Sequence, residues 1–168
     1  HYPLRRQRQM CIRDSSSPYY RLLGMEVAEI KGGESRIQMP FRQNLTHPYG
    51  IVHGGAIASL ADSAVAMALI GLVEPKERIT TIEFKINFFS PVDKGELGAC
   101  AKIIHKGSQT AVGDVEVINE EGKLVAKVIA TRPQFDHNLL MAFLIRSSAS
   151  TRTDREQAML IRSKPSPS

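Results

Sequence analysis

Apolar and polar residues are spaced in two ways along the chain, and each spacing predicts one kind of element. Residues 54–72 are apolar at almost every position, which predicts a buried helix that other elements cover on most sides. Residues 80–91 alternate between apolar and polar side chains, which predicts a strand with one buried face. The apolar members of this alternation are Ile82, Phe84, Ile86 and Phe88. Further strands are expected at residues 95–107, 109–119 and 122–133.

The residues before the helix predict a short helical turn, two strands and a loop. The turn is expected at residues 17–24, the strands at residues 25–41 with a connection at Gly32-Gly33, and the loop at residues 42–52. One long helix followed by an antiparallel meander indicates an α+β protein, in which a curved sheet wraps around the helix.

Composition and charge indicate one globular domain without a nucleic-acid-binding surface. The chain has 168 residues, of which 42% are hydrophobic, and a net charge of +5. Residues 1–15 carry +3 (four Arg, one Asp) and residues 136–168 carry +2 (five basic, three acidic), so residues 16–135 are neutral overall. A neutral domain lacks the basic surface that attracts the phosphate backbone of nucleic acids.

The two ends are expected to lie outside the domain at residues 16–135. MCIRDS, residues 10–15, resembles the translation of a transposon end sequence used in preparing DNA libraries, so we interpret residues 1–15 as a non-native leader. Residues 136–168 begin with an apolar patch at 138–145 that could form a docking helix. The Ser-, Arg- and Pro-rich sequence that follows predicts a largely disordered tail.

Cysteine content and hydropathy favour a cytoplasmic protein that does not enter the membrane. Cys11 and Cys100 are too few for a disulfide framework, and Cys100 is expected in the core because it lies within a strand. The apolar run at residues 56–73 is at the short end of membrane-spanning length and carries Asp62, so we do not interpret it as a span. Residues 1–15 have no apolar segment behind their charges, as a secretory signal would.

Asp62, in the middle of the apolar helix, and the glycines at its start are the first candidates for chemistry. Burying a lone carboxylate is costly, so Asp62 is either used or satisfied structurally by a hydroxyl or a backbone amide. Gly54 and Gly55 would leave the first N–H groups of the helix open to a carbonyl oxygen, as in an oxyanion site. The structural alternative is a tight helix entry that packs close to a strand.

Helix geometry predicts that one chain does not complete this site. Gly54 and Asp62 are eight residues apart, which is about 12 Å at a rise of 1.5 Å per residue. A water that attacks a carbonyl carbon lies about 3 Å from it, and the base about 3 Å from that water. Two antiparallel helices across a two-fold axis meet this requirement, so we expect a site shared between two subunits.

Five segments together resemble the hotdog fold, and in particular its phenylacetyl-CoA-thioesterase-like (PaaI-type) group. They are G-x-V-H-G-G-A-x-A-S-L-A-D-S-A (50–64), F-x-x-P (88–91), V-D-K-G-E (92–96), H-K-G (105–107) and G-K-L-V-A (122–126). The resemblance implies one long central helix wrapped by five to six antiparallel strands. It also implies a homodimer or a dimer of dimers that hydrolyses an acyl-CoA thioester to free acid and CoA without a cofactor.

The resemblance adds catalytic candidates around Asp62 and the glycines. His53 would orient the loop or cap the helix. His47 stands where the family often has an asparagine that places the water or the thioester; this departure puts the usual mechanism in doubt, and Asn44 is a nearby substitute. Thr81 falls where relatives carry a Ser or Thr that contacts the water or the aspartate, although it is also an ordinary strand residue.

Three further residues are candidates for binding the substrate. Ser59 shares the helix face of Asp62, because the two are three residues apart. Lys106 and Gly107 form a turn that would suit a surface contact with a nucleotide phosphate, although lysines in turns are usually only solvated. The acyl preference stays open, as does the choice between Asp62 as general base and Asp62 as direct nucleophile.

Several other functions are excluded or less favoured. The sequence lacks the GxSxG, GxxxxGK and GxGxxG motifs, and its histidines show no paired metal-ligand spacing, so we expect no metal site. A hotdog dehydratase or hydratase would need a histidine placed to move a proton at carbon. This helix offers Asp62 instead, so that function is less favoured. A non-catalytic acyl-CoA-binding protein would keep the pocket and hydrolyse nothing, and His47 keeps this alternative open.

We predict that residues 1–15 are dispensable for folding. A shortened chain that begins at Ser16 should be soluble and should elute from a sizing column as the same oligomer as the full chain, because the removed residues carry charge but no periodic apolar pattern. Loss of soluble protein on this truncation would show that the leader is part of the fold.

Overall fold

The computed structural model describes residues 17–73 and 77–136. The chain divides into two compact units, residues 1–75 with 79–134 and residues 76–78 with 135–168, and β3 (Glu77–Ile79) begins in the second. The expected leader and the expected tail beyond Asp136, with its docking helix, lie outside the described residues.

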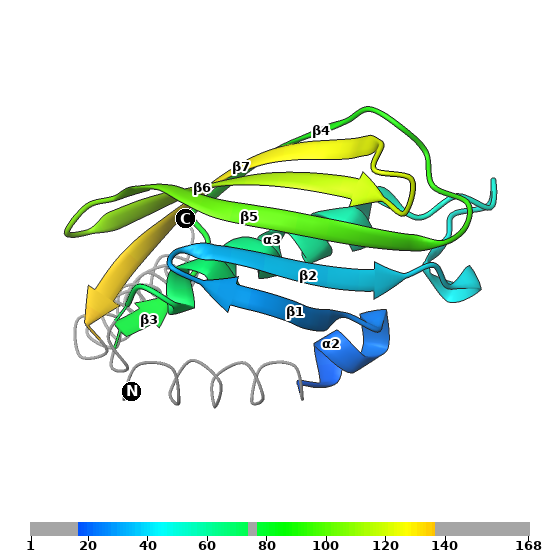
Figure 1. Ribbon diagram of the computed structural model, residues 1–168. Helices are drawn as coiled ribbons and strands as arrows, with labels where there is room; N and C mark the ends of the chain where they lie inside the picture. Colours follow the sequence, from blue (N-terminus) through cyan, green and yellow to red (C-terminus); the bar gives the residue numbers. More distant parts are fainter. Residues whose placement is uncertain (1–16, 74–76, 137–168) are drawn as a thin grey trace, which may run out of the picture. The chain divides into compact units, whose positions relative to one another are not determined.

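The first unit consists of one long helix wrapped by a curved antiparallel sheet (Figure 1). Its elements are α2 (Pro18–Leu23), β1 (Glu26–Lys31), β2 (Glu34–Pro40), the 3-10 helix η1 (Gln43–Leu45), α3 (Gly54–Ile70), β4 (Glu83–Phe88), β5 (Glu96–Lys106), β6 (Thr110–Asn119) and β7 (Leu124–Asp136). Six strands follow the order β1-β2-β5-β6-β7-β4, all antiparallel. The predicted α+β class, with five to six strands around a central helix, is confirmed.

Element boundaries follow local sequence signals. Ser17 caps α2 by accepting a hydrogen bond from the Tyr20 N–H, and Gly24 stops it with a left-handed φ of 70°. The helix α3 ends at Ile70, two residues earlier than expected, because Gly71 has a poor helix propensity. Within the described part of the chain, no helix has the length and hydropathy needed to cross a membrane.

The helix α3 and the inner face of the sheet form the core. Leu60, Ala64 and Ala68 of the helix are fully buried, and β5 presents the small side chain of Ala99 to this core. Polar contacts also join the layers: Ser35 of β2 donates a hydrogen bond to the Ala64 carbonyl (2.7 Å). Small residues on both layers let the helix lie close to the sheet.

Gly113 of β6 lies where α3 comes closest to the sheet. A Cβ at this position would lie 2.5 Å from Cγ1 of Val65, which is shorter than any ordinary contact. Val65 itself is fully buried. Gly113 is therefore required by the close approach of the helix.

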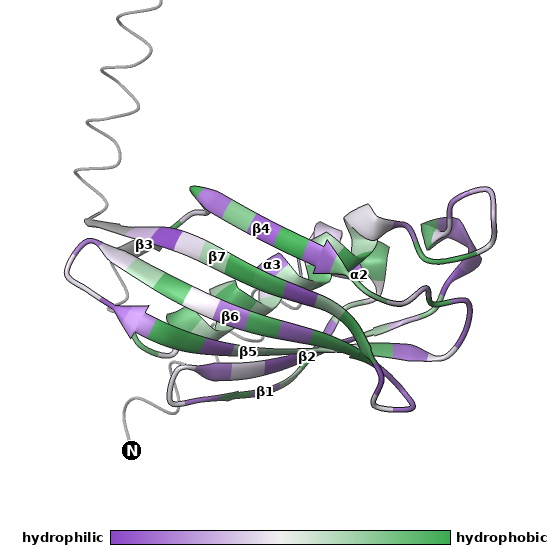
Figure 2. Cartoon of the chain, turned by 90° about the horizontal axis from the view of Figure 1, so that it is seen from above, coloured by the Kyte–Doolittle hydropathy of each residue, from purple (hydrophilic) through white to green (hydrophobic). Residues whose placement is uncertain are grey.

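Hydrophilic and hydrophobic residues alternate along parts of the strands, as the colours in Figure 2 show, because successive side chains of a strand point to opposite faces. In β5, Ala99 and Ala101 are buried against the core, whereas Cys100 between them is exposed. The expectation that Cys100 belongs to the core is therefore wrong. A strand position alone does not bury a residue, because every second side chain points outward.

The expected buried face of the strand at residues 80–91 is also wrong in part. In β4, Phe84 and Ile86 are half-buried, but Phe88 is 51% exposed, and Ile82 just before the strand is 61% exposed. The reason is the position of β4, which among the described strands pairs with β7 alone and so lies at an edge. The alternation predicts the strand but not how far the helix covers it.

The close approach at Gly113 generates a stability prediction. Gly113→Ala should lower the free energy of unfolding by about 1–3 kcal/mol, because the added methyl group overlaps Val65 in a packed core. Adding Val65→Ala should recover part of this loss, although Val65→Ala alone is destabilising. Urea unfolding of the wild type, the two single variants and the double variant measures the coupling between Gly113 and Val65. Strictly additive losses would contradict the close contact.

Candidate active site

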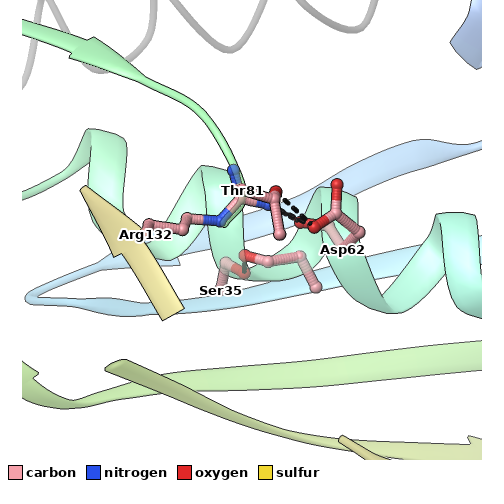
Figure 3. A network of polar contacts seen from close by, with 5 residues as sticks. Ser35, Asp62, Thr81 and Arg132 are labelled. Carbon is pink, nitrogen blue, oxygen red and sulfur yellow. Dashed lines mark hydrogen bonds and ion pairs between the residues drawn. The ribbon is translucent and has the colours of Figure 1, made fainter. Parts of the chain in front are cut away.

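Asp62 lies on the partly exposed face of α3, and one of its carboxylate oxygens is held by two donors. Oδ1 accepts hydrogen bonds from Nη2 of Arg132 (2.7 Å) and from Oγ1 of Thr81 (2.8 Å), as Figure 3 shows. Oδ2 accepts no hydrogen bond from any described residue. The side chain is 41% exposed, so the expected burial of this carboxylate does not occur within a single chain. Oδ2 is the oxygen left for a substrate or a water.

Arg132, which the sequence analysis did not identify, is almost completely buried beside Asp62. Its side chain is 4% exposed, and Nη2 also donates to the backbone carbonyl of Asp62 (2.6 Å). Burial lowers the pKa of the guanidinium, and the charge and hydrogen bond of Asp62 offset this lowering only in part. An arginine keeps its charge at neutral pH, so Asp62 faces a permanent cation.

Strand alternation was the available signal for Arg132. It follows Val128 and Ala130 at every second position of β7, and both of those residues are buried in the core. A charged side chain at the next inward position requires a partner. Asp62 is the charge that α3 carries, so the two could have been paired from the sequence.

Gly54 and Gly55, at the start of α3, have different roles. His53 is the N-cap residue, and its Nδ1 accepts a hydrogen bond from the N–H of Gly55 (2.9 Å). The N–H of Gly54 donates to no described residue. The Gly54 amide is therefore the open donor at the positive end of the helix, and Gly55 serves the cap.

A hollow of about 280 Å³ lies beside the start of α3. Its lining brings together the expected site residues Asn44, His53, Gly55 and Ser59. It also contains Tyr19 of α2, which the sequence analysis did not identify. The Ser59 hydroxyl donates to the Gly55 carbonyl (2.9 Å), so Tyr19 Oη is the donor in its 2.5 Å contact with Ser59 Oγ.

His47 lies in the loop before α3 and is held by the turn that follows it. Its Nδ1 accepts a hydrogen bond from the Tyr49 N–H (3.1 Å), and its ring meets the Tyr49 ring edge-on. A neutral imidazole that accepts at Nδ1 carries its hydrogen on Nε2, which is then a donor. Among the described residues, no group of three or more His, Cys, Asp or Glu side chains could hold a metal ion.

Lys106 and Gly107 lie at the other end of α3. The Gly107 N–H donates to the Thr110 carbonyl (2.8 Å) and closes the turn between β5 and β6. This turn lies beyond Gly113, which packs under Val65 in the second half of α3. A single chain therefore does not bring Lys106 to the Gly54 amide.

Asp62 and Gly54 are also separated within one chain. Both lie on the continuous helix α3, eight residues apart, which corresponds to about 12 Å along the axis. Of the expected site residues, the structure places Thr81 against Asp62, and it groups Asn44, His53, Gly55 and Ser59 around the start of the helix.

Comparisons with known proteins identify the family of this fold and site. Residues 49–126 match the model of the thioesterase superfamily. Acyl-coenzyme A thioesterase PaaI of Escherichia coli is 33% identical over 107 residues, 62% of this chain and 73% of that protein. A putative esterase of Saccharolobus solfataricus is 30% identical over 112 residues, 67% of this chain and 79% of that protein.

Solved structures agree with these relatives. A conserved protein of Pseudomonas aeruginosa has a TM-score of 0.70 and 30% identity, with 73% of this chain and 98% of that one covered. A mutant of the phenylacetic acid degradation protein PaaI of Thermus thermophilus has a TM-score of 0.65 and 30% identity, with 70% and 98% covered. The chain therefore belongs to the thioesterase superfamily, as a hotdog-fold thioester hydrolase of the PaaI type.

Proposed function

We propose that this protein hydrolyses an acyl-CoA thioester to the free acid and CoA at a site shared between two subunits. The observation that carries the proposal is the carboxylate of Asp62, which is held through Oδ1 and, among the described residues, has no donor at Oδ2 on a partly exposed helix face. Relatives named acyl-coenzyme A thioesterase and 1,4-dihydroxy-2-naphthoyl-CoA hydrolase support CoA as the thiol part of the substrate. CoA is then substrate, and the reaction uses no further cofactor.

In this reaction Asp62 acts on water through Oδ2. The carboxylate takes a proton from the water as its oxygen attacks the thioester carbonyl carbon. The tetrahedral intermediate then collapses, the carbon–sulfur bond breaks, and the CoA sulfur leaves as a thiolate or takes up the proton. A thiolate is a good leaving group, so one carboxylate and one oxyanion donor suffice without an acyl-enzyme.

The start of α3 polarises the carbonyl. The open Gly54 N–H, at the positive end of the helix, donates to the oxygen on which negative charge develops. His53 supports this role by capping the helix through the neighbouring Gly55 N–H, which leaves the Gly54 amide available. The Nε2–H of His47 is the proposed donor in place of the asparagine found in the family.

A homodimer formed through β4 would complete the site. This strand pairs with β7 on one side, and within the described residues its other edge is unpaired. Ile82, Phe88 and Phe89 are exposed there, and an apolar open edge favours pairing with a second chain. A two-fold axis would pair β4 with its own copy, antiparallel.

The register of β4 against α3 supports the shared site. Thr81, just before β4, contacts Asp62, whereas the Phe88 ring at the end of β4 lies beside Gly54, 3.1 Å from where a Cβ would be. An antiparallel β4 pair centred between Lys85 and Ile86 sets the start of one strand against the end of the other. It therefore brings Asp62 of one subunit towards the partner's Gly54.

The face of α3 that would meet the partner helix consists of small side chains. Gly55, Ser59, Asp62 and Ala66 lie on this face, and none of them is buried in the single chain. Small residues allow two helices to approach closely, and the partner would then cover Asp62.

The remaining parts of the proposal follow from this dimer. Thr81 steadies Asp62, and Ser59 and Asn44 line the acyl side of the site. Lys106, at the far end of α3, is the proposed contact for a nucleotide phosphate of CoA bound mainly to the partner, with Gly107 shaping its turn. A dimer of dimers in the cytoplasm is the assembly and location that we propose.

Asp62→Asn should separate this activity from non-catalytic binding of acyl-CoA. The amide keeps the shape of the side chain but accepts no proton, so kcat should fall about 10²–10⁴-fold while acyl-CoA binding persists. Release of free thiol from a panel of acyl-CoAs gives the rate, and melting temperature on the same preparation controls for folding. Unchanged turnover per folded molecule, or a wild-type protein that binds acyl-CoA without releasing thiol, would refute the mechanism.

Mixing two inactive variants should restore activity if the site is shared. In a hybrid of Asp62→Asn and Gly54→Val subunits, one of the two sites has both an intact carboxylate and an open amide. A random mixture should therefore recover up to about a quarter of wild-type turnover, since half of the dimers are hybrids with one site each. Native mass spectrometry confirms hybrid formation. Confirmed hybrids without activity, or an active monomer in light scattering, would place both groups in one chain.

A further inference from the structure

We infer that Arg132 is a positioning residue for this reaction, whose guanidinium fixes the Asp62 carboxylate so that Oδ2 faces the substrate. This inference rests on the proposed thioester hydrolysis. Arg132 itself lies behind the carboxylate, on its Oδ1 side, and acts through Asp62.

One donor atom of Arg132 holds both the side chain and the backbone of Asp62. A single atom, Nη2 of Arg132, lies 2.6 Å from the backbone carbonyl oxygen of Asp62 and 2.7 Å from its Oδ1. The guanidinium thereby ties the side chain of Asp62 to the helix backbone of the same residue. An aspartate held in this way keeps one rotamer, and Oδ2 points away from the donor (Figure 3).

The two partners of this ion pair differ in burial. The Arg132 side chain is 4% exposed, whereas that of Asp62 is 41% exposed. A half-exposed aspartate on a helix would otherwise sample several rotamers, and ordering it during each turnover costs entropy. Because Arg132 is already ordered by the core, the carboxylate is placed before the substrate arrives.

Among the described residues, the Asp62 carboxylate faces one charged donor and one neutral donor. Arg132 reaches it from β7, and the neutral hydroxyl of Thr81 reaches it from the residues just before β4. A charge-assisted hydrogen bond is roughly twice as strong as a neutral one. Arg132 is therefore the stronger of the two anchors, and Thr81 completes the geometry.

The test is a double-mutant cycle on kcat with Arg132→Met, Asp62→Asn and the double variant. Arg132→Met fills most of the same volume, and it should lower kcat about 10²-fold with little change in KM, because a misplaced catalytic group costs about that factor. Arg132→Lys keeps the positive charge but not the planar guanidinium, and its fall in kcat should be smaller than that of Arg132→Met. In the Asp62→Asn background, Arg132→Met should cause no further fall in kcat.

Lys127→Met provides a matched control on the same strand. Lys127 points to the outer face of β7 and is ion-paired with Asp114 and Glu116, so its loss removes a paired cation of β7 that does not touch Asp62. It should leave kcat unchanged. If Arg132→Met does not fold, Arg132→Lys carries the test, with a partial loss of kcat that vanishes in the Asp62→Asn background.

The outcomes separate this inference from the proposed function. A wild-type protein that hydrolyses no acyl-CoA overturns both. If the wild type is active, the positioning role alone is overturned when Arg132→Met has a normal kcat per folded molecule. It is also overturned when, in the double variant, the fall in kcat caused by Arg132→Met multiplies with the fall caused by Asp62→Asn. A shift in KM without a change in kcat would also overturn it, since substrate binding would then be the affected step.

Discussion

The ion pair between Asp62 and Arg132 joins the central helix to the sheet at the point where function is proposed. Arg132 reaches inward from β7 and holds both the backbone carbonyl and the Oδ1 of Asp62. The core therefore fixes a carboxylate that is itself exposed. This arrangement decides which oxygen of Asp62 is open and in which direction it points.

The fold was predictable because its signals are local. The unbroken apolar run predicts α3, Gly32 and Gly33 predict the connection between β1 and β2, and the alternation at residues 80–91 predicts β4. The predictions that were wrong concern the burial of single residues and not the elements that contain them. Cys100 lies in a strand as expected but on the outer face, and Phe88 continues an alternation at an edge that the helix does not cover.

The candidate site was predictable only in part, because it joins residues that are far apart in the sequence. The helix pattern contains Gly54 and Asp62, but the signal for Arg132 lies 70 positions after Asp62, at an inward position of β7. His53 shows a different limit. Its imidazole accepts a hydrogen bond from the Gly55 N–H, so Gly55 and Gly54 have different roles. This contact depends on the rotamer of the His53 side chain.

The most direct test of the shared site is a crystal structure with an acyl-CoA analogue in which a methylene group replaces the thioester sulfur. We expect its carbonyl oxygen about 3 Å from the Gly54 nitrogen of one protomer. We expect room for one water between its carbonyl carbon and Oδ2 of the partner's Asp62. A carbonyl that faces Gly54 and Asp62 of the same protomer, or that contacts neither, would contradict the account.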